Sequence, residues 1–214
     1  MEQERARQIQ TMFSRITRRY DLMNRVMTGG RDQAWRRMAA RELRLGAGGL
    51  VLDLATGTGD LAFAVREAYP DARVVAMDFS ETILREGVRK ARVRDEQRVA
   101  WGVGDALALP FPDATFDGCT NAFLIRNVVD LPLCLREMKR VVKPGGRVIV
   151  PTFCHDETAL SWVVSRALAV TGFPGHRRFT TKSLRRAVED SGVRVNRTET
   201  LPGVIPIGYV EGTS

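Results

Sequence analysis

The 214-residue chain is 44% hydrophobic and carries a formal net charge of +8, values that suit one globular domain with a full core. No apolar run approaches the roughly 18 residues of a membrane span, and the charged N-terminus lacks the apolar stretch of a secretory signal. Three widely spaced cysteines, Cys119, Cys134 and Cys154, argue against a disulfide framework or a zinc site. We therefore expect a cytoplasmic protein with no metal site.

The positive charge is concentrated near the N-terminus. Residues 1–49 hold eleven Arg and five acidic residues, a net charge of +6, whereas the remainder holds 22 basic and 20 acidic residues, a net charge of +2. A basic segment of this kind favours peripheral contact with an anionic membrane, although solvated Arg-rich helices have the same composition. No helix-turn-helix pattern or aromatic-interleaved basic platform occurs, so nucleic acid is not a predicted partner.

Taken in chain order, the apolar periodicity predicts two helices and then a regular alternation of strands and helices. The first helices are expected over 2–19 and 32–43, followed by a loop at 46–49. Strands are then expected at 50–55, 73–77, 98–103, 115–121 and 146–152, with helices at 60–69, 80–91 and 131–142. Such alternation is typical of an α/β fold, here a doubly wound, mostly parallel Rossmann-like sheet covered on both faces.

The pattern changes after residue 152. It predicts a helix near 157–169, a Gly/Pro loop at 172–175, a helix at 181–190 and strands near 193–200 and 204–210. The last two strands are expected to form an antiparallel hairpin at the sheet edge. We predict a single domain over 1–214, in which 1–49 is a helical cap or lid on a core of 50–214.

A glycine-rich turn follows the first expected strand, with the sequence D-L-A-T-G-T-G-D at 53–60. Gly57 and Gly59 let a ligand approach the main chain, and the next strand ends on Asp78, an acid at the distance that suits a ribose diol. Asp53 would repel a pyrophosphate but attract a cationic amino group. The ligand that combines a ribose with a charged amino-acid tail is S-adenosylmethionine, which is the predicted cofactor.

Several motifs together resemble the class I methyltransferases: the glycine turn, M-D-F-S at 77–80, G-D-A-L-A-L-P-F at 104–111 and R-V-V-K-P-G-G-R at 140–147. One branch is more similar still. M-F-S-R-I-T-R-R-Y-D-L-M-N-R-V-M-T at 12–28, W-R-R at 35–37 and I-R-N-V-V-D at 125–130 resemble the ubiquinone/menaquinone biosynthesis C-methyltransferases. The resemblance runs from about residue 8 to 150 and fades from Pro151. It implies methyl transfer to a ring carbon of a demethylmenaquinol-like polyprenyl quinol.

The resemblance also implies roles for individual residues. The cofactor would contact the turn and the ends of the strands through Asp53, Gly57, Thr58, Gly59, Asp78, Phe79, Asp105, Ala106, Asn121 and Ala122. Asp105 is expected near the adenine amine, which needs an acceptor, and Asn121 and Ala122 beside the methionine part. The catalytic set would be Arg126 and Asn127 after the fourth strand, with Tyr20 and Asp21 on a lid.

The chemistry explains why an arginine is expected at position 126. A ring carbon becomes nucleophilic when the neighbouring phenol ionises, and a guanidinium favours the phenolate. Arg is a poor base because it stays protonated, so Asp21, His155 or a bound water remain candidates for that role. Two alternatives stay open: a phospholipid amine or soluble small metabolite as the acceptor, and a nucleoside-binding regulatory protein without catalysis. A homodimer is a possible assembly in either case.

Overall fold

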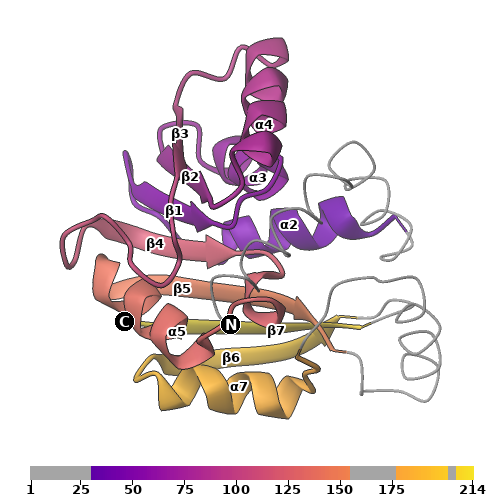
Figure 1. The fold of residues 1–214 in the computed structure, drawn as a ribbon, viewed down its shortest axis with the longest axis vertical. Helices are drawn as coiled ribbons and strands as arrows, with labels where there is room; N and C mark the ends of the chain where they lie inside the picture. Colours follow the sequence, from indigo (N-terminus) through magenta and orange to yellow (C-terminus); the bar gives the residue numbers. More distant parts are fainter. Residues whose placement is uncertain (1–29, 155–176, 202–205) are drawn as a thin grey trace.

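The computed structural model describes residues 30–154, 177–201 and 206–214. Within them, seven strands form one sheet in the order β3-β2-β1-β4-β5-β7-β6, visible from top to bottom in Figure 1. Its members are β1 (Leu50–Leu54), β2 (Arg73–Asp78), β3 (Val99–Val103), β4 (Phe116–Asn121), β5 (Val142–Phe153), β6 (Arg194–Leu201) and β7 (Ile207–Thr213). The expected helices at 2–19 and 157–169 and the loop at 172–175 lie outside the described residues.

The first five strands run parallel, and β7 pairs antiparallel with both β5 and β6. The predicted Rossmann-like sheet with a C-terminal hairpin is therefore confirmed. One boundary differs: β5 begins at Val142, four residues before the predicted start at 146, because Phe116 of β4 already pairs with Val142. The pairing with β4 shifts register between Phe116 and Gly118, so Gly118 pairs with Arg147.

The helices are α2 (Asp32–Arg41), α3 (Asp60–Ala68), α4 (Glu81–Val93), α5 (Leu131–Val141) and α7 (Thr181–Asp190), with a 3₁₀ turn, η1 (Leu124–Arg126). Local signals explain where two of them begin. The Asp130 side chain accepts from the backbone N–H of Leu133 at the start of α5, and Thr180 and Ser183 form a capping box at α7.

Side chains on both faces of the sheet are buried, as a parallel sheet requires. Leu52, Cys119 and Val148 belong to a core on one face that includes residues of α5 and α7. Val51 and Ile149, on the opposite face, belong to a second core that includes residues of α2 and α3. Because β1 has β2 on one side and β4 on the other, the strand order reverses between β1 and β4. The carboxyl ends of the strands at such a reversal are where open α/β sheets bind their ligands. No helix among the described residues is long and apolar enough to cross a membrane.

Candidate functional site

The glycine turn between β1 and α3 is fastened to the end of β2. The N–H of Thr56 donates to the carbonyl of Met77 over 3.0 Å, and the N–H of Gly57 donates to Oδ2 of Asp78 over 2.9 Å. The other oxygen of Asp78 accepts from the N–H of Ser80. Asp78 is only 8% exposed, and burial raises the pKa of its carboxyl group. The acid predicted to face a ribose thus lies directly against the turn.

Three residues of the turn have positive φ angles: Ala55 (54°), Gly57 (60°) and Gly59 (84°). Glycine adopts this region freely, but a residue with a Cβ is strained there by about 1–2 kcal/mol. Ala55 was not singled out from the sequence, because only a glycine would have signalled the left-handed conformation. A Cβ on Gly59 would lie 2.3 Å from Cη2 of Trp101, so close packing as well as backbone conformation requires glycine at this position.

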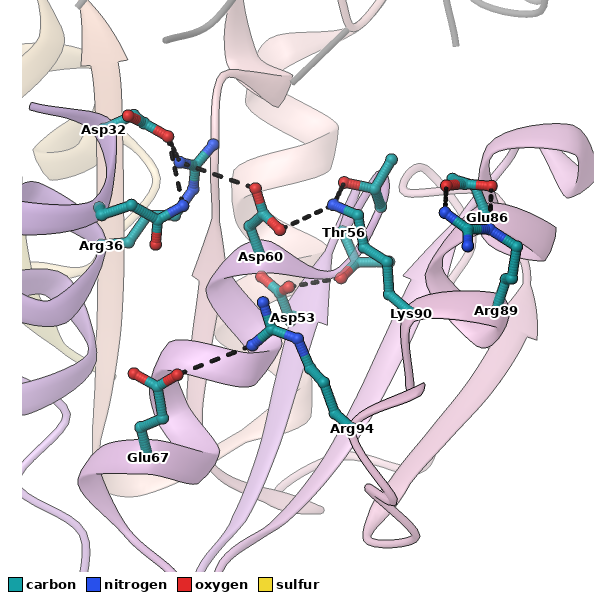
Figure 2. A network of polar contacts seen from close by, with 12 residues as sticks. Asp32, Arg36, Asp53, Thr56, Asp60, Glu67, Glu86, Arg89, Lys90 and Arg94 are labelled. Atoms are coloured by element: carbon teal, nitrogen blue, oxygen red, sulfur yellow. Dashed lines mark hydrogen bonds and ion pairs between the residues drawn. The ribbon is translucent and has the colours of Figure 1, made fainter. Parts of the chain in front are cut away.

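Asp53 lies in β1 beneath the turn and is completely buried. Its two oxygens accept from the hydroxyl groups of Thr56 (2.5 Å) and Thr120 (2.8 Å), the first of which is drawn in Figure 2. Desolvation outweighs these hydrogen bonds and raises the pKa of Asp53 to about 6. Neither threonine was predicted; the spacing of Thr56, three residues after the acid, is the one sequence signal that could have indicated it.

The remaining predicted cofactor residues lie at neighbouring strand ends. Asp105 follows β3 and is exposed, with Oδ1 accepting from the N–H of Leu107 over 2.9 Å, while Ala106 and Phe79 are half-buried. Asn121 ends β4 and is completely buried. Its Nδ2 contacts the sulfur of Met138 (3.3 Å), and its Oδ1 has no hydrogen-bond partner among the described residues. Half-buried Ala122 follows it directly.

Arg126 ends η1, just after β4, and is 3% exposed. Its guanidinium lies over the rings of Phe123 (5.6 Å) and Phe153 (5.0 Å), which stack on each other with centroids 4.3 Å apart. Asn127, the next residue, has a buried Oδ1 without a hydrogen-bond partner in the described part of the chain. This end of β4 therefore combines a buried cation with buried amide acceptors.

A second arginine, Arg177, fixes the backbone that follows η1. Its guanidinium donates to the carbonyls of Val128 and Val129, the latter over 2.6 Å, and its N–H donates to the carbonyl of Arg126 over 3.2 Å. No local pattern could have indicated this role, because Arg177 lies 49 and 48 positions from the two carbonyls that it binds.

The structure brings the predicted turn, Asp78, Asp105, Asn121 and Arg126 to the carboxyl ends of consecutive parallel strands. Tyr20, Asp21 and His155 lie outside the described residues. No cluster of three or more potential metal ligands occurs in the described ranges.

The fold and the glycine turn at the strand-order reversal define a class I, Rossmann-like methyltransferase architecture. The sequence profile of the ubiE/COQ5 methyltransferase family matches residues 1–174, and the chain belongs to this family. The match extends beyond residue 150, where the resemblance was expected to fade.

Individual relatives agree with this assignment. The chain is 45% identical over 150 residues to the "Ubiquinone/menaquinone biosynthesis C-methyltransferase UbiE" of Desulfotalea psychrophila, covering 70% of this chain and 58% of that protein. It is 48% identical over 142 residues to the "Demethylmenaquinone methyltransferase" of Thermus thermophilus, covering 66% of this chain and 64% of that protein. The match thus spans about six tenths of the length of these two relatives.

Solved structures share the fold at lower identity. A SAM-dependent methyltransferase from Aquifex aeolicus superposes with a TM-score of 0.70 at 21% identity, covering 91% of this chain and 98% of that one. A geranyl diphosphate methyltransferase solved in complex with SAM gives a TM-score of 0.69 at 19% identity, covering 85% of each chain.

Proposed function

We propose that the protein transfers a methyl group from S-adenosylmethionine to a ring carbon of a demethylmenaquinol-like polyprenyl quinol. The observation that carries this proposal is the position of a buried arginine, Arg126, directly after β4, on the same edge of the sheet as Asp78 and the glycine turn. Names of relatives at 45% and 48% identity support the same reaction.

The residues of the turn suit the methyl donor. Gly57 N–H and Asp78 lie together at the end of β1 and β2, so the Asp78 carboxylate can also accept from ribose hydroxyls through its remaining lone pairs. The buried Oδ1 of Asn121 offers a further acceptor for an amino group. The ionised form of Asp53, beneath the turn, adds negative charge that favours a cationic tail over a phosphate. When bound, the sulfonium of the donor supplies an already activated methyl group.

Arg126 has the properties that a phenolate stabiliser needs. Its low exposure and the flanking rings of Phe123 and Phe153 keep the guanidinium in a medium of low dielectric, where attraction to a developing oxygen charge is strong. Arg177 would hold the carbonyls after η1 so that this side chain stays in place. A base is still needed, and Asp21, His155 or a bound water are the proposed candidates.

The deciding measurement is the mass of the product formed from demethylmenaquinol and S-adenosylmethionine. We expect the mass of the product to exceed that of the quinol by one CH₂ unit. With a donor labelled in its methyl group, the label should be found on a ring carbon. Arg126→Ala should lower turnover by about 10²–10³-fold while adenosylhomocysteine still binds, and Arg126→Lys should recover only part. Arg186→Ala, on the exposed face of α7, is the matched control. Turnover with a phospholipid amine or soluble molecule instead of the quinol would redirect the proposal to those acceptors.

The proposed acceptor also requires access to a membrane, because its isoprenoid tail stays in the bilayer. The net charge of +6 over residues 1–49 supports peripheral attachment to anionic lipid. Co-sedimentation with anionic vesicles should be weak and should disappear at high salt. Absence of binding at low salt would count against a lipid quinol.

A further inference from the structure

A network of charged side chains links α2, the start of α3 and α4 beside the glycine turn (Figure 2). Nζ of Lys90, on α4, lies 2.8 Å from Oγ1 of Thr58 and 2.9 Å from Oδ1 of Asp60. The other oxygen of Asp60 lies 3.9 Å from a guanidinium nitrogen of Arg36, which in turn donates to Asp32 over 2.6 Å. This network contains two carboxylates and two cations, so its formal charges balance.

These groups are withdrawn from solvent, which distinguishes them from the other ion pairs of α4. The Lys90 side chain is 19% exposed, and the side chains of Asp60, Arg36 and Asp32 are less exposed. In the neighbouring Arg89–Glu86 pair, by contrast, the arginine side chain is 65% exposed. A desolvated ion pair resists screening by salt and restricts the groups it joins. A long side chain held at two acceptors has also lost most of its rotamer freedom.

The Lys90 contact falls within the glycine turn itself. Thr58 lies between two residues with positive φ, Gly57 and Gly59, and Asp60 is the first residue of α3. The turn is held by Met77 and Asp78 from the β2 side. Lys90, on α4, adds a separate side-chain contact to the turn at Thr58, 32 positions away in the sequence.

We propose that Lys90 is a positioning residue for the methyl donor: it keeps the glycine turn in the shape that receives the ligand. This inference rests on the proposed function. A turn that is already ordered loses less conformational entropy when a ligand binds, so affinity is gained without direct contact. Without the ammonium, the Thr58 hydroxyl loses this donor, and the cation that remains near Asp60 in the described part of the protein is the more distant guanidinium of Arg36.

The experiment compares Lys90→Met with Arg89→Met by titration calorimetry with adenosylhomocysteine. Methionine keeps the straight side chain and helix propensity while removing the charge. We expect Lys90→Met to weaken binding about ten-fold, the size of one charge-assisted hydrogen bond, and Arg89→Met to bind as the wild type does. Turnover should show the KM for the donor rising about ten-fold while kcat at saturating donor stays within about two-fold of the wild type. Loss of folded protein alone would instead lower kcat and leave KM unchanged.

Thr58→Val provides an independent route if Lys90→Met folds poorly. It removes the acceptor on the turn and should weaken binding to a similar degree. The loss of binding free energy in the double variant should be smaller than the sum of the losses in the two single variants. Wild-type affinity in Lys90→Met, equal losses in Lys90→Met and Arg89→Met, or full additivity with Thr58→Val would overturn the inference. A wild-type protein that does not bind adenosylhomocysteine would overturn the proposed function itself, and the inference with it.

Discussion

The carboxylate of Asp78 accepts a hydrogen bond from the backbone N–H of Gly57 over 2.9 Å, which joins the end of β2 to the turn that follows β1. The same carboxylate accepts from the N–H of Ser80 and so orders the start of α4. One buried acid therefore both shapes the turn and presents its remaining lone pairs at the edge of the sheet.

Replacing Asp78 by Ala should weaken adenosylhomocysteine binding by about ten- to a hundred-fold, because a charged acceptor is removed from the turn and from the proposed contact with the ribose. Calorimetric titration measures this directly. Asp71→Ala, an exposed acid before β2, is the control and should leave affinity unchanged. Equal affinities for the Asp78 variant and the wild type would remove Asp78 from the site.

Asp53 should make stability depend on pH in the acid range. Burial raises its pKa from 3.8 to about 6, so the folded state holds the proton more tightly than the unfolded state does. The resulting stabilisation is complete below about pH 4 and is lost as pH rises towards about 6. Asp53→Asn lacks this titration. Relative to that variant, the wild type should lose roughly 3 kcal/mol of unfolding free energy across this window, at about 1.4 kcal/mol per pKa unit.

Urea unfolding of the two proteins at several pH values between about 4 and 7 provides the test. A difference in stability that stays constant with pH would mean that Asp53 has an ordinary pKa in the folded protein.

Gly87, inside α4, should resist replacement by Ala although alanine is the better helix former by about 0.8–1.0 kcal/mol. A Cβ at this position would lie 2.4 Å from Cζ3 of Trp101, the same ring that covers Gly59. We expect Gly87→Ala to destabilise the protein by about 1–3 kcal/mol. In a Trp101→Leu background, where the ring is absent, the same change should become neutral or stabilising. The test compares the denaturant midpoints of the wild type, the two single variants and the double variant.

Arg177→Met should lower kcat and leave adenosylhomocysteine affinity unchanged, because Arg177 holds the carbonyls of Val128 and Val129, which follow η1 and do not belong to the glycine turn. In Arg177→Lys, the ammonium can donate to the carbonyls but lacks the planar fork of a guanidinium. We therefore expect a kcat between those of Arg177→Met and the wild type. Steady-state kinetics at saturating donor reports the effect, with Arg186→Met on α7 as the control. A loss confined to donor affinity would contradict this role.

Local sequence patterns were sufficient to predict most of the architecture. The period-2 and period-3.6 alternation gave the described strands and helices to within a few residues, and the run of helices between parallel strands determined the class of sheet. The turn at 53–60 and the acid at the end of β2 were also readable. Their chemistry depends on residues that are close in sequence or that end neighbouring parallel strands, whose ends must meet.

Contacts between distant segments were decided only by the tertiary structure. Thr120 reaches Asp53 across 67 positions, Lys90 reaches Thr58 across 32, and Arg177 reaches Val128 across 49. No periodicity encodes such pairs, because each depends on which strands become neighbours and on how far the helices are set from the sheet. Burial has the same origin: Arg126 and Asp53 are polar in sequence, and only the packing of both faces of the sheet removes them from water and changes what their charges can do.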